Sequence, residues 1–194
     1  GDSVIVHSSL SSLGFVVGGP ITAVQALMDV VADAGTIVMP SHSYYYGDPG
    51  RWYGTALPES WIREMRDSLP AFDPAVTPTT GMGKTVEVFR TWPGTLRSRH
   101  PVNSFAAWGH HAERVTAGHT YEYWQGDGSP LGRLYELDGK VLLIGVGYDR
   151  NTSFHLADHR FPHTPKKRMT LPLPKDGRCE WREFDGVQEM SSGP

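Results

Sequence analysis

The sequence predicts one α/β domain: a three-layer α/β/α-like sandwich around a mostly parallel sheet, followed by a C-terminal β-hairpin. Three observations favour this class. Strand-like and helix-like segments alternate along the first forty residues. A near-continuous apolar run at residues 141–146 is typical of a strand covered on both faces. Two strand-like arms flank Asp176-Gly177, a common hairpin turn.

The first strand, helix and strand can be placed from local patterns. Val4 to Val6 reads as a strand, and a turn-rich connection follows it. Pro20 is suited to the start of a helix, because proline lacks the N–H that would have no partner there. Apolar residues recur on one face of this helix, at Val24, Leu27, Met28 and Val31. Residues 36–39 then form a second strand, and we expect the two strands to be parallel.

The middle of the chain is less regular. Residues 41–80 carry four of the eight tyrosines, several prolines and one helix candidate at 59–68. Because a long connection inside a compact domain is usually functional, we expect a substrate-facing lobe here. Further helices are predicted at residues 84–91, 110–117 and 129–136.

Composition limits the function classes. The 194 residues, 39% of them hydrophobic, suffice for one well-buried domain over residues 1–194. A net charge of −3 and scattered basic residues favour neither nucleic acid nor an anionic membrane. No apolar run approaches the roughly 20 residues needed to span a bilayer, so we expect a soluble, cytoplasmic protein. The only cysteine, Cys179, excludes an internal disulfide and a zinc–thiolate cluster.

Two strand ends carry candidate chemistry, because ligands of open α/β sheets bind beyond the carboxyl ends of the strands. The first is the hydroxyl-rich segment from His7 to Leu13, whose backbone N–H groups and serines could hold phosphates. The alternative is an ordinary serine-rich turn. Neither GxxxxGK[ST] nor GxGxxG is present, so the fingerprints of an ATPase and of a dinucleotide site are absent.

The second strand end leads to His155, Asp158 and His159, which a helix would place on one face. Such a face suits proton transfer or metal binding. Leu156 stands where a zincin helix carries its glutamate, so that motif's general base is missing. A serine hydrolase is disfavoured because no GxSxG elbow accompanies Ser8 or Ser9.

Other stretches suggest a ligand site. Residues 97–101 form a short basic loop followed by Ser104, which suits a phosphate or ribose, although a solvated surface loop explains it equally well. Aromatic residues and carboxylates mix around Tyr44, Asp48 and Trp52, and again at residues 121–124. These clusters suit a cationic, hydroxyl-rich ligand, although aromatic residues in loops more often serve packing.

Six stretches, taken in order, resemble the aminoglycoside 3-N-acetyltransferase family: VIVHSSLSSLG, GGPITAVQALMDVV, GTIVMPSHS, FRTWPGTLRSRHPVNSFAAWG, GDGSPLGRLYELDGKVLLIGVG and NTSFHLAD. The resemblance covers nearly the whole chain and is specific, because separate motifs agree in order and spacing. Relative to that family, we expect the chain to lack an N-terminal helical segment and part of the C-terminal β region.

The resemblance implies a donor, an acceptor and site residues. Acetyl-CoA is the cosubstrate, no metal is needed, and the acceptor is the 3-amino group of an aminoglycoside antibiotic. His155 matches the catalytic histidine, and Asp158 stands where the family commonly has glutamate. The segments that match the CoA contacts supply His7, Ser8, Ser9, Leu10, Ser11, Ser12, Arg97, Ser98, His100 and Ser104. Because aminoglycosides are polycations, the candidates for the acceptor pocket are Tyr44, Asp48, Glu59, Asp73 and Glu122.

The expected mechanism is direct attack of the amine on the thioester with His155 as general base, since histidine suits proton transfer near neutral pH. Asp158 would orient the imidazole. Two other classes stay open: a metal-dependent hydrolase using His155, Asp158 and His159, and a non-catalytic CoA-binding relative. A homodimer is also an open alternative.

Overall fold

The computed structural model describes residues 1–51 and 57–188, so the predicted ligand residue Trp52 lies outside the described residues. One sheet has the strand order β3-β4-β2-β1-β5. Its strands are β1 (Ser3–Ser8), β2 (Thr36–Pro40), β3 (Leu96–Arg97), β4 (Phe105–Gly109) and β5 (Lys140–Ile144). β1 pairs in parallel with β2 and β5, whereas β4 is antiparallel to β2 and β3. Four of the five strands therefore share one direction, and the predicted mostly parallel sheet is confirmed.

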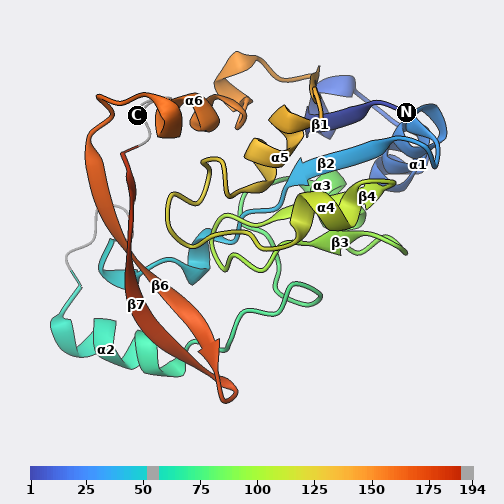
Figure 1. Ribbon diagram of the computed structural model, residues 1–194. Coiled ribbons are helices and arrows are strands. Elements are labelled where there is room, and N and C mark those ends of the chain that lie inside the picture. The colour runs from blue at the N-terminus through green and yellow to red at the C-terminus, as the bar shows by residue number, and fades with distance from the viewer. Residues whose placement is uncertain (52–56, 189–194) are drawn as a thin grey trace.

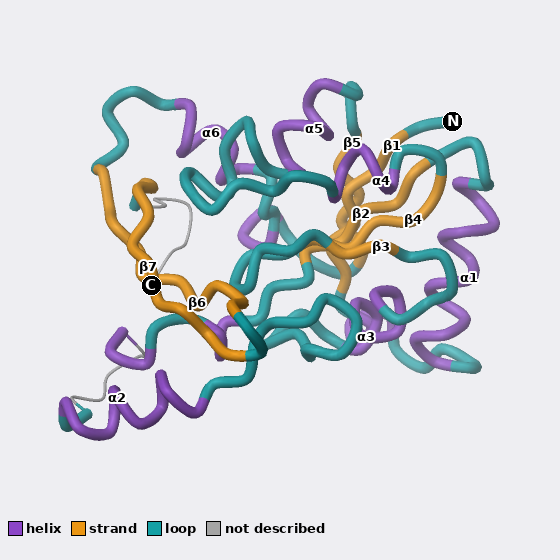
Figure 2. The backbone as a smooth tube through the Cα atoms, turned by 60° about the horizontal axis from the view of Figure 1, so that its bottom comes forward, coloured by secondary structure: helices purple, strands orange, loops and turns teal. Residues whose placement is uncertain are grey.

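Helices cover both faces of this sheet (Figure 2). They are α1 (Gly19–Val31), α2 (Glu59–Ser68), α3 (Lys84–Arg90), α4 (Ala112–Thr116), α5 (Pro130–Glu136) and α6 (Phe154–Arg160). Short 3-10 turns lie at Leu10–Leu13, Tyr44–Tyr46, Pro49–Arg51 and Tyr148–Arg150. Within the described ranges no helix is long and apolar enough to cross a membrane.

Alternate residues of the strands build two separate cores. Val4 and Val6 of β1 face α1 and α3, and the intervening Ile5 faces α4, α5 and α6. β2 repeats the pattern, with Ile37 on the first side and Val38 on the second. Successive side chains of a strand point to opposite faces, so covering both faces requires a continuous apolar run rather than alternation. The predicted three-layer sandwich is confirmed.

The helices form where the pattern predicts them. In α1, Val24 and Met28 are buried, and Leu27 and Val31 pack beside them. α2 matches the predicted bounds, and α3 ends one residue earlier than predicted. At α5 the side chain of Ser129 accepts the N–H of Leu131, so this serine caps the helix. α4 is shorter than the predicted helix at 110–117, because the chain still turns at residues 110 and 111.

The expectation that the apolar run at residues 141–146 is an interior strand is wrong. β5 lies at the edge of the sheet in the described residues, and its strand ends at Ile144. Val141 and Leu142 are 43% and 37% exposed. The same run of apolar side chains suits an inner or an edge strand, so only the strand order distinguishes the two.

The predicted C-terminal hairpin is confirmed. β6 (Lys166–Lys175) and β7 (Arg178–Val187) pair around Asp176-Gly177, both of which have positive φ. Figure 1 shows the hairpin apart from the main sheet and beside α2. The indole of Trp181 donates to the carbonyl of Arg66 in α2. At the other end of the hairpin, a Cβ on Gly186 would lie 2.1 Å from the Trp124 ring, so glycine allows the close approach.

Candidate functional site

A pocket of about 1030 Å³ opens at the carboxyl ends of β1 and β5. Its wall includes His7, Ser8, Ser9, Leu10 and Ser11 of the predicted hydroxyl-rich loop. The loop stays close to the sheet because the N–H of Ser9 donates to the carbonyl of Ile144. The side chain of Ser12, also predicted to bind cofactor, instead donates to the Ser9 hydroxyl at 2.9 Å. Five of the six predicted loop residues therefore share one cavity.

The electrostatics of this pocket favour an anion. Gly19 and Pro20, at the N-terminus of α1, line it, and no side chain caps that helix. Uncapped N–H groups at a helix N-terminus attract negative charge. Lys84 and Arg150 bring cationic side chains to the same wall, although Arg150 is paired with Asp149 at 3.0 Å. Phosphate groups would be accommodated here.

The sequence reasoning missed Lys84 and the glycines before it. Gly81, Met82, Gly83 and Lys84 line the pocket together, where the chain enters α3. Gly81 and Gly83 both have positive φ, so this approach to the helix depends on glycine. The signal in the sequence was a GMGK tetrapeptide directly before an apolar-periodic segment.

His155 and Asp158 lie on one face of α6, as the spacing predicts. Nδ1 of His155 is 3.3 Å from a carboxylate oxygen of Asp158. The side chains are 15% and 10% exposed, so the pair is largely withdrawn from water. A carboxylate on Nδ1 leaves the Nε2 lone pair as the basic position of a neutral imidazole.

His159 faces a different partner. Its Nδ1–H donates to the backbone carbonyl of His155 at 2.8 Å, one helical turn earlier, and its ring contacts Trp124 edge-on. Among the described residues, no three or more histidine, cysteine, aspartate or glutamate side chains gather as metal ligands. The open alternative of a metal site built from His155, Asp158 and His159 therefore gains no support from the geometry.

Two further histidines surround His155. His7 and His42 both interact electrostatically with it; His7 lies in β1, one residue before its end, and His42 lies two residues after β2. Burial, followed by the charge of His155, lowers the pKa of His7 to about 4. Burial is also the main cause that lowers the pKa of His42 to about 3. Both rings are therefore neutral near pH 7, so neither competes with His155 for a proton.

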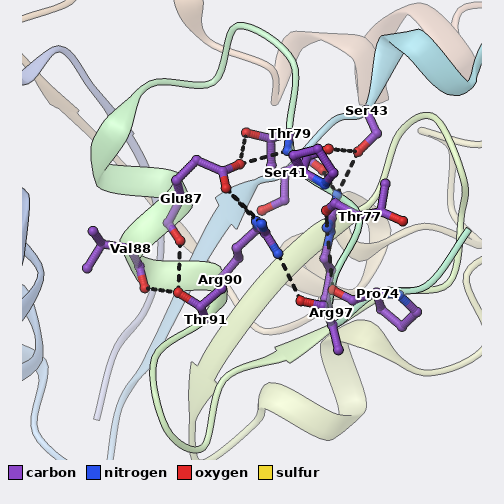
Figure 3. Close-up of polar contacts among 12 residues, drawn as sticks. Ser41, Ser43, Pro74, Thr77, Thr79, Glu87, Val88, Arg90, Thr91 and Arg97 are labelled. Carbon is purple, nitrogen blue, oxygen red and sulfur yellow. Dashed lines mark hydrogen bonds and ion pairs between the residues drawn. The ribbon is translucent and has the colours of Figure 1, made fainter.

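Arg97 is the most extensively bonded side chain of the predicted basic loop. Its guanidinium donates to the carbonyls of Ser41 and Thr77 and to the hydroxyl of Ser43 (Figure 3). It also donates to the hydroxyl of Ser104. It is 8% exposed, and burial lowers its pKa to about 10. These contacts hold the segment that carries His42, directly after β2, against the end of β3.

Three further polar residues of that stretch are also buried, whereas Arg99 is exposed. The hydroxyl of Ser98 bonds to His119, and Nδ1 of His100 accepts the backbone N–H of Asn103 at 2.9 Å. Ser98, His100 and Ser104 are each at most 1% exposed. None of the four predicted cofactor residues in this stretch lines the pocket at His7 and Ser8. A polar turn that follows a strand resembles a ligand-binding loop in sequence, even where its side chains are buried in the fold.

The predicted acceptor residues line no common pocket in the described part of the chain. Asp48 is buried and forms a two-pronged ion pair with Arg66, so its charge is already balanced. Glu59 begins α2 on the surface, and the exposed Asp73 accepts the N–H of Ala75. Tyr44 bonds to Nδ1 of His42 at 2.8 Å, and His42 interacts electrostatically with His155.

Glu122 lines a separate, shallow pocket beside the end of α6. Tyr121, Asp127 and Phe184 share that wall, and Asp127 is paired with Arg160. This pocket combines aromatic and acidic side chains, as the sequence suggested for a cationic ligand. It is reached from the His159 side of α6 rather than from the pocket at β1.

Comparisons with known proteins match this chain to one family. The model of the family described as aminoglycoside 3-N-acetyltransferase matches residues 5–193. The Bacillus subtilis (strain 168) protein YokD, named as an SPbeta prophage-derived aminoglycoside N(3')-acetyltransferase-like protein, is 45% identical over 189 residues, which are 97% of this chain and 70% of YokD. Aminoglycoside N(3)-acetyltransferase VII of Streptomyces paromomycinus is 36% identical, over 96% of this chain and 65% of that enzyme.

Solved structures of similar proteins have the same fold. The YokD crystal structure matches with a TM-score of 0.94 at 44% identity, over 98% of this chain and 71% of that one. AAC-IIIb, solved as a binary complex with CoASH, matches with a TM-score of 0.81 at 35% identity, over 97% of this chain and 70% of that one. AAC-VIa with bound sisomicin matches with a TM-score of 0.84 at 33% identity, with the same coverage.

The chain thus spans about two thirds of the length of these relatives. Within that span the match is continuous, from the first strand of the sheet to the hairpin. The chain therefore belongs to the aminoglycoside 3-N-acetyltransferase family, and the acyltransferase class predicted from its sequence is confirmed.

Proposed function

We propose that this chain transfers the acetyl group of acetyl-CoA to the 3-amino group of an aminoglycoside, with His155 as general base. The observation that carries the proposal is the His155–Asp158 pair on α6, next to a pocket lined by His7 and Thr152. A relative of the same fold has been solved with CoASH, and another with sisomicin. These two complexes support the donor and the class of acceptor.

The pocket at β1 is our candidate site for the acyl carrier. Its hydroxyls, the N-terminus of α1 and Lys84 would hold the phosphate groups, and its cavity reaches inward as far as His7. The thioester would lie near His7 and Thr152, because Thr152 lines the pocket and leads into the helix of His155. Exclusion of water at this depth strengthens the polar contacts.

The chemistry requires one proton transfer before the acyl group can move. The amine nitrogen attacks the thioester carbonyl carbon, and Nε2 of His155 takes a proton from the nitrogen. The C–S bond then breaks, the CoA thiolate leaves and is protonated, and an amide is formed. Asp158 holds the Nδ1–H of the imidazole and stabilises the imidazolium that forms in this step.

A thiol-release assay tests this assignment with acetyl-CoA and a panel of aminoglycosides. We expect His155→Gln to lower kcat by about 10²–10⁴-fold, the usual contribution of a general base, while CoA still binds. His110→Gln is the matched control, because that histidine is exposed and lies beyond β4.

Three outcomes separate the alternatives. Turnover by His155→Gln within about threefold of the wild type contradicts the general base. Binding of acetyl-CoA without thiol release from any aminoglycoside supports the non-catalytic relative. Hydrolytic activity that a chelator abolishes supports the metal-dependent hydrolase.

A further inference from the structure

His7 joins two segments that are distant in the sequence. It lies in β1, and its Nε2 accepts the backbone N–H of Thr152 at 2.9 Å. The His7 side chain is 7% exposed, and both residues line the pocket at the carboxyl ends of β1 and β5. One hydrogen bond therefore connects the pocket wall to the segment that leads into α6.

This contact determines the tautomer of the ring. A backbone N–H can only donate, so Nε2 of His7 must present its lone pair, and a neutral imidazole then carries its proton on Nδ1. Nδ1 is buried and has no hydrogen-bond partner among the described residues. The ring orientation thus satisfies the N–H of Thr152 and leaves Nδ1 without a partner. A missing hydrogen bond is costly in a protein interior.

Thr152 in turn fixes the first turn of the helix. The N–H of His155 donates to the carbonyl of Thr152 at 3.1 Å, and the N–H of Phe154 donates to that of Asn151 at 3.3 Å. A shift of Thr152 would therefore carry the backbone of His155 with it. A misplacement of about 1 Å at a reacting group costs on the order of 10²-fold in rate.

Burial, aided by the nearby charge of His155, keeps the His7 ring neutral. Its neighbours include the imidazoles of His155 and His42, and the pocket wall adds Lys84, Asp149 and Arg150. Burial, followed by the positive charge of protonated His155, lowers the pKa of His7 to about 4. The acceptor lone pair on Nε2 is therefore present at every pH at which a histidine base works.

We propose that His7 is a positioning residue for the general base: its neutral, Nδ1-protonated imidazole holds Thr152, and so fixes the helix that carries His155 beside the carrier pocket. This role rests on the proposed function of His155 and differs from the cofactor contact that the family resemblance implies for His7. It explains why a histidine with an unsatisfied Nδ1 is buried in the wall of this pocket.

Nuclear magnetic resonance on the intact chain tests the geometry without any activity. With ¹⁵N-labelled histidine, we expect His7 to show the Nδ1–H tautomer. In His155→Gln the pKa of His7 should rise, because the repelling cation is removed, whereas His110→Gln should leave it unchanged. Relative to the wild type, the amide proton of Thr152 should exchange with solvent slightly faster in His7→Gln. In His7→Leu it should exchange much faster. An Nε2–H tautomer, or equal Thr152 exchange in His7→Leu and the wild type, would overturn the proposal.

Kinetics then separate positioning from simple cofactor contact. We expect His7→Leu to lower kcat on the order of 10²-fold, with the Kd of CoA within about threefold of the wild type. His7→Gln should restore most of kcat, because its amide oxygen can accept the Thr152 N–H. Loss of CoA affinity with unchanged kcat would assign His7 to the pocket wall alone. If the wild type proves inactive, the proposed function fails. The tautomer of His7 and the exchange rate of the Thr152 amide still test the hydrogen bond between these two residues. If His7→Leu fails to fold, the spectra of His7→Gln and of the wild type still test the proposal.

Discussion

Acidification should destabilise this fold at a specific set of buried histidines. His7 and His119 have their pKa lowered to about 4, and His42 to about 3, in each case chiefly by burial. All three rings are at most 8% exposed. His119 is held between the Ser98 hydroxyl and the carbonyl of Trp124, so protonation cannot simply turn it outward.

The sign follows from proton uptake in the unfolded chain. An unfolded histidine titrates near 6.5, so below that pH the unfolded state binds more protons than the folded state. The stability contributed by the neutral rings is complete above about pH 6.5 and is lost as the pH falls towards their folded pKa values. Between about pH 7 and pH 5, each histidine lowers the free energy of unfolding by about 2 kcal/mol, which sums to about 4–6 kcal/mol for the three. That is a large part of the roughly 5–15 kcal/mol typical of a domain.

Urea unfolding followed by tryptophan fluorescence, at about pH 7, 6 and 5, measures this loss as a fall in the free energy of unfolding. His42→Asn, which keeps an acceptor near the position of Nδ1, should reduce the loss by about 2 kcal/mol. His110→Asn, at an exposed position, should leave the pH dependence unchanged. A total change below about 1 kcal/mol between pH 7 and pH 5 would show that the buried rings accept protons in the folded state, and would refute the reasoning.

Two substitutions test the packing that supports the site. Arg97→Met should destabilise the fold by about 2–4 kcal/mol, because several buried oxygens lose their donor. Urea unfolding measures this change, and Arg99→Met, at an exposed position, is the control. Equal stability of the two variants would contradict the prediction. Gly186→Ala should cost about 1–3 kcal/mol, since the new Cβ would overlap Trp124. A thermal melt that matches the wild type would show that the hairpin moves without penalty.

Much of the fold could be predicted from local patterns. The apolar runs of β1 and β2, the helical face of α1 and the Asp176-Gly177 turn each encode one element within a few residues. A sheet covered on both faces needs unbroken apolar strands, and the sequence displays them. The pairing of His155 with Asp158 was also predictable, because the two lie three apart on one short helix.

Side chains that are polar in sequence but buried in the fold were harder to interpret. Arg97 resembles a ligand-binding residue by type, yet its guanidinium donates to backbone carbonyls of other segments, those of Thr77 and Ser41. His100 is also buried, and its Nδ1 accepts the N–H of Asn103 within the same turn. Asp48 is likewise neutralised by Arg66, 18 residues away. No local pattern distinguishes a polar group that awaits a ligand from one whose partner is distant in the chain.

The sequence by itself determined the periodicities, and with them the strands, the helices, the hairpin and the face of α6 that carries His155. Only the tertiary structure decided that β5 lies at the edge of the sheet, that His7 reaches Thr152 across 145 residues, and that His42 stands beside them. The physical reason is that hydrophobic patterning acts over one or two turns of chain, whereas strand order, burial and hydrogen bonds between distant segments are set only when the layers pack together.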